Sequence, residues 1–191
     1  MMSQKRALIF AMVIAMCALA AACDENGSST YSSGDGAASA KNVQLAPADQ
    51  EFAVKASMAG RHEVALGKLV ADRASDSEVK AFGKRMVQDH SRAGEDLSKI
   101  TSKLGISVPA EDDASFKETY AKLSNLKGKE FDRAYMSEMV AGHSKVATEV
   151  DSYAKGGGNA DLKGWATKAA PVVHDHLQMA QGIEARISKS M

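Results

Sequence analysis

Four ionisable residues stand near the middle of four separate apolar stripes: Glu63, His90, His143 and His176. The apolar residues around each recur at steps of three and four, which is typical of amphipathic helices. Because burying an unpaired polar group costs about 1–3 kcal/mol, one such residue in each of four helices predicts that the four side chains meet. Three imidazoles and one carboxylate are suitable ligands for Zn, Cu or Fe, whereas Mg and Ca prefer oxygen ligands. The sequence therefore offers a candidate transition-metal site.

The same residues are also compatible with a core that holds no metal. Buried histidines can hydrogen-bond Glu63, Tyr135 or one another and so form a satisfied polar layer. Counted from the short turns, His90 and His176 lie farther along their helices than Glu63 and His143, which predicts an axial offset of about 7 Å. An offset of this size would stretch or split a four-ligand site, so both interpretations stay open.

Three further polar residues flank the stripes and could support the candidate ligands. Asp89 and Asp132 could each accept a hydrogen bond from a histidine and orient its ring, and Tyr135 could contribute in the same outer layer. Two other histidines, His62 and His174, lie off the main stripes and are expected to face solvent. We therefore assign neither of them to the site.

Motifs for known catalytic chemistry are absent from the sequence. Ferritin-type di-iron centres need a Glu-x-x-His pair on two helices, but Val87 and Val173 stand three residues before His90 and His176. There is also no Ser/His/Asp or Cys/His nucleophile set, no phosphate-binding loop and no pair of zinc-ligating cysteines. The sequence therefore does not predict an enzyme.

The four stripes predict four long helices. A capping motif, Ser75-Asp76-Ser77-Glu78, precedes the second helix, and Asn159 is a suitable N-cap for the fourth. The apolar positions, helix by helix, are Phe52, Ala56, Ala59, Leu66 and Val70; Val79, Phe82, Met86, Ala93, Leu97, Ile100 and Leu104; Phe131, Tyr135, Met139, Val146, Val150 and Tyr153; and Leu162, Trp165, Ala169, Val172, Met179, Ile183 and Ile187.

The lengths of the connections predict the topology. The first two helices join over a few residues near 73–75, and the last two join over the glycines at 156–158, so each pair should be an antiparallel hairpin. The longer connection at 105–127 contains a short helix that is expected to begin near Pro109. The predicted fold class is all-α, a ferritin-like four-helix bundle made of two hairpins joined by a long crossover, over residues 47–188.

The N-terminus has the features of a secretory signal, which we predict for residues 1–23. Lys5 and Arg6 form a short basic start, and an uninterrupted apolar run follows at 7–22. This run is shorter than the roughly 20 residues that a membrane-spanning helix needs. A basic start, an apolar middle and small residues at the exit predict export.

The end of the signal predicts lipid anchoring. Small residues followed by Cys23 resemble a bacterial lipobox, in which this cysteine is lipidated. Ala20 and Ala22 also satisfy ordinary signal cleavage, which is the alternative. Asp24 resembles the retention signal of lipoproteins that stay at the inner membrane. Residues 24–46 are rich in Ser, Gly and Ala and are expected to be a flexible tether between anchor and bundle.

Composition excludes some classes of partner. Lys plus Arg and Asp plus Glu each number 24, and removal of the basic signal leaves a slight negative excess. A nucleic-acid partner is therefore not expected, because phosphate binding needs a basic surplus. The two cysteines are Cys17, inside the signal, and Cys23, so no disulfide is predicted within the mature chain.

Motifs on all four helices resemble one family. The sequence is similar to a bacterial family of exported proteins of unknown function, the type called domain of unknown function 4142, which is placed among the ferritin-like folds. The resemblance covers about residues 48–188 and implies fold and location but no reaction. It rests on Glu63-Val64 with Leu66-Gly67, Met86-Val87-x-Asp89-His90, Phe131-Asp132-x-x-Tyr135, Met139-Val140-x-x-His143, and Pro171 with His176-Leu177.

These observations predict an exported, lipid-anchored helical bundle that acts as a binding or envelope-maintenance module. Its protein partners are not identified by the sequence. The first alternative is a periplasmic protein that binds or buffers Cu, Zn or Fe through the four stripe residues. The second is a redox enzyme with one metal ion at the same place, although the sequence indicates no substrate pocket.

Overall fold

The computed structural model describes residues 45–189, whose regular secondary structure is entirely helical. It contains five helices, α1 (Pro47–Arg73), α2 (Ser77–Leu104), α3 (Ala114–Ser124), α4 (Gly128–Gly156) and α5 (Ala160–Ser188), and this described part has no strand. The predicted signal, Cys23, Asp24 and the tether as far as residue 44 lie outside the described residues. None of the described helices is long and apolar enough to span a membrane.

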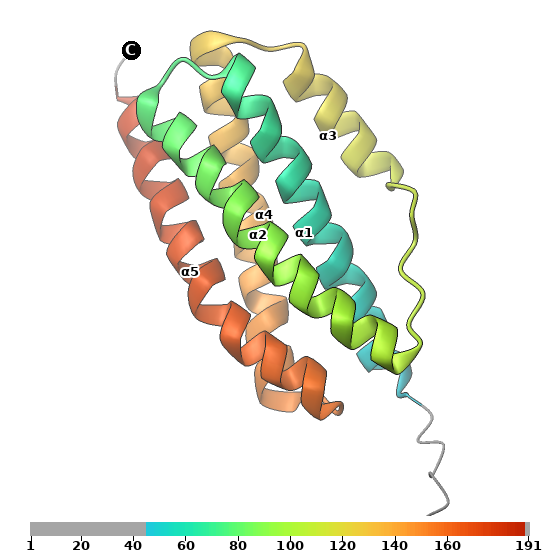
Figure 1. Ribbon diagram of the computed structural model, residues 1–191. Helices are drawn as coiled ribbons and strands as arrows, with labels where there is room; N and C mark the ends of the chain where they lie inside the picture. The colour runs from blue at the N-terminus through green and yellow to red at the C-terminus, as the bar shows by residue number, and fades with distance from the viewer. Residues whose placement is uncertain (1–44, 190–191) are drawn as a thin grey trace, which may run out of the picture. The chain divides into compact units, whose positions relative to one another are not determined.

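The long helices form a four-helix bundle of two antiparallel hairpins (Figure 1). α1 packs along α2 and α4 packs along α5, while α2 also contacts α5 and α1 contacts α4. Between the hairpins the chain runs back along the bundle, and α3 lies on the outside against α1 and α4. The predicted all-α bundle of two hairpins joined by a long crossover is confirmed. The short helix of the crossover begins at Ala114, later than the predicted start near Pro109, because Asp113 provides its N-cap.

Local sequence determines where the helices begin and end. Asp76 caps α2 by accepting hydrogen bonds from the backbone N–H groups of Glu78 and Val79. The N-cap is therefore Asp76 and not Ser75, the first residue of the capping motif. The Ser75 hydroxyl donates instead to Asp132. Gly105 ends α2 with φ at 67°, a left-handed conformation that favours glycine. Asn159 caps α5 as predicted.

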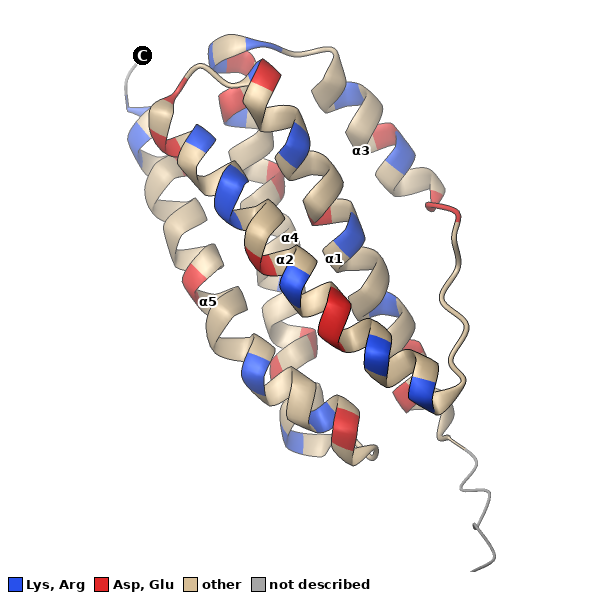
Figure 2. Ribbon diagram, in the orientation of Figure 1, with Lys and Arg blue, Asp and Glu red and all other residues tan. Residues whose placement is uncertain are grey.

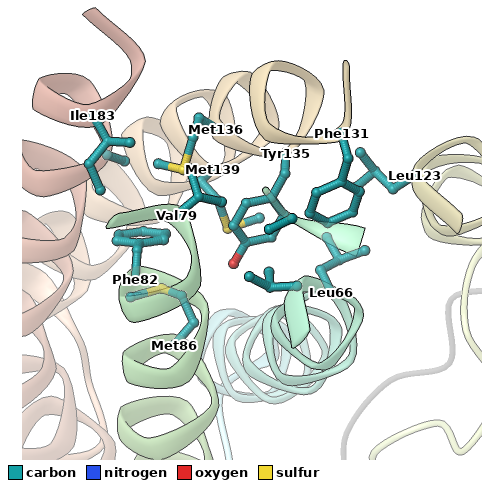
Figure 3. Close-up of a cluster of buried hydrophobic side chains, with 13 residues drawn as sticks. Leu66, Val79, Phe82, Met86, Leu123, Phe131, Tyr135, Met136, Met139 and Ile183 are labelled. Carbon is teal, nitrogen blue, oxygen red and sulfur yellow. The ribbon is translucent and has the colours of Figure 1, made fainter. Parts of the chain in front are cut away.

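The hydrophobic core has two clusters, one toward each end of the bundle. The cluster in Figure 3 packs residues of all five helices around Phe82, Phe131 and Tyr135. The other packs Phe52 against Tyr153, with ring centroids 3.7 Å apart, beside residues that include Leu97, Val150 and Leu162. Along α1, α2, α4 and α5 the polar stripe residues lie between the positions that supply the two clusters.

The apolar stripe of α5 differs from the prediction at one position. Val172 was expected in the core but is 40% exposed, whereas Val173 is buried. The buried face of α5 runs through Ala166, Val173, His176, Ala180 and Ile183. Val172 instead lines a pocket beside the core, so a helical spacing alone does not separate core residues from pocket residues.

Each short turn is held by a buried aspartate from a neighbouring helix. Asp132 of α4 accepts hydrogen bonds from the backbone N–H groups of Ser75 and Asp76 and from the Ser75 hydroxyl. Asp49 of α1 accepts from the Tyr153 hydroxyl and from the backbone N–H of Gly158 in the other turn. The two hairpins therefore hold one another's turns in the same way.

This arrangement corrects one prediction. Asp132 was expected to orient a histidine, but both of its carboxylate oxygens accept hydrogen bonds from the α1–α2 turn. Its burial within the described bundle is explained by that turn, because a buried carboxylate needs donors from the chain around it. Asp132 is a structural residue.

We expect Asp132→Ala to lower the free energy of unfolding by about 1–3 kcal/mol, because it leaves the partly buried donors of the turn without their acceptor. Chemical denaturation of the two proteins measures this difference. Asp72→Ala is the control, since Asp72 is an exposed residue near the same turn and should change stability by less than about 0.5 kcal/mol. Equal effects of both substitutions would contradict the role given to Asp132.

Candidate metal centre

The four stripe residues converge at the centre of the bundle. His90 Nε2 lies 2.5 Å from Glu63 Oε2, and His143 Nε2 lies 3.3 Å from the same oxygen. One ring nitrogen from each of His90, His143 and His176 lies within 4.8 Å of the other two. The four side chains therefore lie close together, as predicted. Each of the four long helices contributes one of them.

The expected axial offset does not separate them. In an α-helix each Cα–Cβ bond leans toward the helix N-terminus. The N-termini of α2 and α4 lie at one end of the bundle and those of α1 and α5 at the other (Figure 1). Side chains from the two sets of helices therefore lean toward one another, which brings residues at different backbone heights into contact.

The atoms that face the centre have no hydrogen bond. They are buried and are Glu63 Oε2, His90 Nε2, His143 Nε2 and His176 Nδ1. Glu63 Oε2 forms a close ion pair with His90 Nε2 and lies near His143 Nε2, but none of the four atoms makes a hydrogen bond of good geometry. Because buried polar atoms are almost always hydrogen-bonded, four such atoms in one place are an unusual feature of this core.

The outward-facing nitrogens of two rings are held by the protein. His143 Nδ1 lies 2.9 Å from the carbonyl oxygen of Met139, and His176 Nε2 lies 2.9 Å from Asp89 Oδ2. Both acceptors require the histidine nitrogen to carry the proton. The lone pairs of His143 Nε2 and His176 Nδ1 are then directed into the cluster. This is how protein groups fix the tautomer of a metal-binding histidine.

Asp89 is itself held in place. Arg85, one turn earlier on α2, donates from Nε to Asp89 Oδ2 at 3.2 Å and from a terminal nitrogen to Asp175 Oδ2 at 2.6 Å. Asp89 therefore links α2 to His176 on α5, as expected for an orienting acceptor. The sequence contained a signal for the role of Arg85, since Arg85 and Asp89 have the i, i+4 spacing of helical ion pairs.

Burial and charge set the protonation of the cluster. Burial tends to raise the pKa of Glu63, but the contact with His90 and the nearby His143 and His176 outweigh it, so the pKa lies below its ordinary value. Burial tends to lower the pKa of His90, yet Glu63 holds it above its ordinary value. For His143 and His176 burial prevails and the pKa is lowered. Two neutral imidazoles therefore lie beside a Glu63–His90 ion pair.

Tyr135 lies next to this ion pair in the core. Its side chain is fully buried and its hydroxyl has no hydrogen-bond partner in the described part of the chain. Burial, and then the negative charge of Glu63, raise the pKa of Tyr135 far above its ordinary value. Tyr135 is thus a neutral hydroxyl (its oxygen is drawn in Figure 3), and its role as an outer residue of the site stays a prediction.

The two remaining histidines lie outside the cluster. His174 is exposed and pairs with Asp151 Oδ2 at 3.0 Å, as expected. His62 was predicted to face solvent, and this prediction is wrong. Its ring stacks on Phe116 of α3 at 3.8 Å, and its Nε2 lies 3.2 Å from Asp112 Oδ1. This residue joins the crossover to α1, a role that the sequence could not indicate because Phe116 is distant along the chain.

The site has the dimensions of a mononuclear centre. Among residues 45–189 the three histidines, His90, His143 and His176, are the one group of three or more His, Cys, Asp or Glu side chains close enough to share a metal ion. At the positions where a di-iron site would need carboxylates, Val173 is buried and Val87 is partly buried against Gly67. The structure therefore has apolar side chains where bridging carboxylates would be required.

A pocket that the sequence did not predict opens beside the cluster. Its volume is about 380 Å³, and Glu63, His90 and His176 form part of its wall. Trp165 also lines it and donates from its indole nitrogen to the carbonyl oxygen of Ala93, across from α5 to α2, at 3.1 Å. Small residues on several helices leave this space, so it arises from their packing together and is not visible in any one stripe.

A comparison with family models matches residues 35–183 to the domain of unknown function DUF4142. The chain belongs to this family. The comparison with curated proteins gives no match. The family expected from the sequence motifs is therefore confirmed, while DUF4142 carries no assigned activity that could be transferred to this site.

Two solved structures share the fold of this DUF4142 protein. A DUF305 fragment from Deinococcus radiodurans is 11% identical with a TM-score of 0.67, and the match covers 74% of this chain and 98% of the fragment. A DUF305 protein from Streptomyces coelicolor, provisionally described as secreted, is 16% identical with a TM-score of 0.64, over 74% and 92% of the two chains. At these identities the likeness concerns the fold alone.

In the metal-free DUF4142 protein we expect Glu63→Gln to lower the pKa of His90 to below its ordinary value of about 6.5. The substitution removes the negative charge that raises this pKa and leaves burial, which lowers it. An NMR titration of the His90 ring protons measures the change.

When the pKa of His90 falls below its ordinary value, the pH dependence of its contribution to the free energy of unfolding should reverse. In the wild type this contribution is complete below about pH 6.5 and is lost as the pH rises through the raised pKa, whereas in the variant the loss occurs as the pH falls. Glu138→Gln, at an exposed position of α4, is the matched control. An unchanged His90 titration in Glu63→Gln would show that Glu63 does not control this group.

Proposed function

We propose that this protein binds one transition-metal ion through Glu63, His90, His143 and His176, and that it holds or buffers this metal outside the cytoplasm. The observation that carries the proposal is the convergence of four buried polar atoms, one from each long helix, none of which has a hydrogen bond. A bundle core normally pairs such atoms or excludes them. A bound cation would satisfy all four together.

Zn²⁺ fits this donor set best. A tetrahedral ion with bonds of 2.0–2.1 Å needs ligand atoms about 3.3 Å apart. The contacts of Glu63 Oε2 with His90 and His143 are 2.5 and 3.3 Å, and the histidine nitrogens lie within 4.8 Å of one another, so small ring movements would close the site. Three nitrogens and one oxygen match the preference of Zn²⁺, and Cu and Fe use the same ligand types.

The protonation state supports metal binding. Histidine ligates through a neutral imidazole and glutamate through its carboxylate. The lowered pKa values of His143, His176 and Glu63 place these three groups in the ligating form near neutral pH. His90 must release a proton to bind, which the positive charge of an incoming ion favours.

We expect added Zn²⁺ to raise the melting temperature of the metal-free protein near neutral pH, since a ligand that binds only the folded state stabilises that state. The effect should weaken below about pH 6, where protons compete for the imidazoles. Differential scanning calorimetry with and without Zn²⁺ measures it, and isothermal titration should give one ion per chain.

Single substitutions test which residues hold the ion. Alanine at His90, His143 or His176 should abolish the thermal shift, whereas His174→Ala should retain it, because His174 is exposed and lies outside the cluster. Equal loss in all four variants would indicate nonspecific binding. If Zn²⁺, Cu²⁺ and Fe²⁺ all leave the melting temperature of the wild type unchanged, the metal proposal is wrong and the metal-free polar layer is the better explanation.

We also propose that the bundle is exported and anchored to the outer face of the inner membrane through a lipid on Cys23. The support is the basic start, apolar run and terminal cysteine of the signal, followed by Asp24 and a Ser/Gly-rich segment. A similarly folded protein that is provisionally described as secreted adds to it. In this location the bundle would meet metal ions that enter the periplasm.

The anchor makes a separate prediction. Cys23→Ser should move the mature protein from the membrane fraction to the soluble periplasmic fraction, because the hydrocarbon chains attached to cysteine provide the membrane affinity. Cell fractionation with immunodetection measures the distribution, and Cys17→Ser is the control, since Cys17 lies inside the predicted signal. A wild-type protein found entirely in the soluble fraction would favour ordinary cleavage after Ala22.

A further inference from the structure

The pocket beside the metal centre has the character of a small-molecule site. Its volume of about 380 Å³ lies within the range of about 300–1,000 Å³ that is typical of ligand pockets. Its wall combines one polar region, formed by Glu63, His90 and His176, with aliphatic side chains and Trp165. An apolar wall with a few convergent polar groups is the usual composition of such a site.

The space results from small residues at positions where a bundle normally has large ones. A Cβ atom added at Gly60 of α1 or Gly94 of α2 would meet no atom within 4 Å. Ala59 and Ala169 line the same space from α1 and α5. The pocket is therefore bordered by backbone and methyl groups, and a larger side chain at one of these glycines would extend into it.

Charge around the pocket depends on the metal ion. Without a metal the three carboxylates of the wall balance its three Lys and Arg side chains, the protonated His90 adds one positive charge, and Figure 2 shows charges of both signs along α2. A bound divalent cation would add two positive charges at the inner end while His90 gives up its proton, so the pocket would gain one positive charge. The balanced charged groups of the wall are Glu63, Asp89, Asp96, Arg85, Arg92 and Lys168.

We infer that this pocket binds a monocarboxylate with a compact hydrocarbon body, its carboxylate next to the metal ion and its apolar body against Trp165 and the small residues. The inference rests on the proposed metal site, because the ion supplies the charge that a carboxylate would compensate. Zinc sites can add a fifth ligand, so the carboxylate can approach while the four side chains stay bound.

Trp165 provides the measurement. It is the sole tryptophan of the chain and it lines the pocket, so its fluorescence should report on an occupant. Octanoate is the probe, and it is titrated into Zn²⁺-loaded and metal-free protein. We expect a saturable change in emission, with octanoate bound at least about tenfold more tightly when Zn²⁺ is present.

Two related compounds separate the contributions of head and body. Octanol has the same apolar body without the charge, so its binding should not depend on Zn²⁺. Acetate has the carboxylate without the apolar body and should bind at least about tenfold more weakly than octanoate, because it buries little apolar surface.

Variants test the location. Gly60→Leu should weaken octanoate binding by about tenfold or more by filling the pocket, while Zn²⁺ still binds. Gly94→Leu should do the same from the opposite helix if the first variant fails to fold. Gly182→Leu is the control, because Gly182 is an exposed helical glycine outside this pocket and the substitution should leave both ligands unaffected.

The outcomes distinguish this inference from the proposed function. If none of Zn²⁺, Cu²⁺ and Fe²⁺ binds, the metal proposal fails first and the carboxylate inference falls with it. If Zn²⁺ binds but octanoate leaves Trp165 unchanged, the pocket inference alone is wrong. If octanoate binds equally well with and without Zn²⁺ and Lys168→Gln weakens it, the carboxylate lies at the rim, which contradicts the orientation inferred here.

Discussion

Four buried polar atoms at one point in the core are the constraint on which the rest of the structure depends. Glu63, His90, His143 and His176 come from four helices, and their inward atoms have no hydrogen bond. The cost of burying such groups separately is about 1–3 kcal/mol or more each. Their meeting places the four groups together, where the cation proposed above would satisfy all of them. The two hydrophobic clusters and the clamped turns hold the helices in the register that this meeting requires.

The surroundings of the cluster determine which nitrogens of two histidines face its centre. The Met139 carbonyl and Asp89 take the outward protons of His143 and His176, which directs the free lone pairs inward. Burial keeps those two imidazoles neutral by lowering their pKa values. At the centre itself one donor faces one acceptor, in the Glu63–His90 ion pair, and the proposed cation would take the place of the shared proton.

The sequence was informative where one residue type at one spacing determined the outcome. Helical periodicity and short turns predicted the bundle and its crossover, and the cost of burial predicted that the four polar residues meet.

The expected axial offset between the four side chains was wrong because counting residues ignores the direction in which side chains lean. Asp132 was misassigned because its partners, Ser75 and Asp76, lie in a turn that is close in space only after folding. The pocket was missed because a cavity depends on small residues from several helices together.

The most direct test of the central claim is a long-range ¹H–¹⁵N NMR correlation of the histidine rings, recorded before and after Zn²⁺ is added. In the metal-free protein His143 should carry its proton on Nδ1 and His176 on Nε2, which are opposite tautomers set by Met139 and Asp89. On metal addition the unprotonated nitrogens, His143 Nε2 and His176 Nδ1, should shift strongly while the protonated ones shift little. The reverse tautomers, or a Zn²⁺-induced shift confined to the exposed His174, would contradict the account.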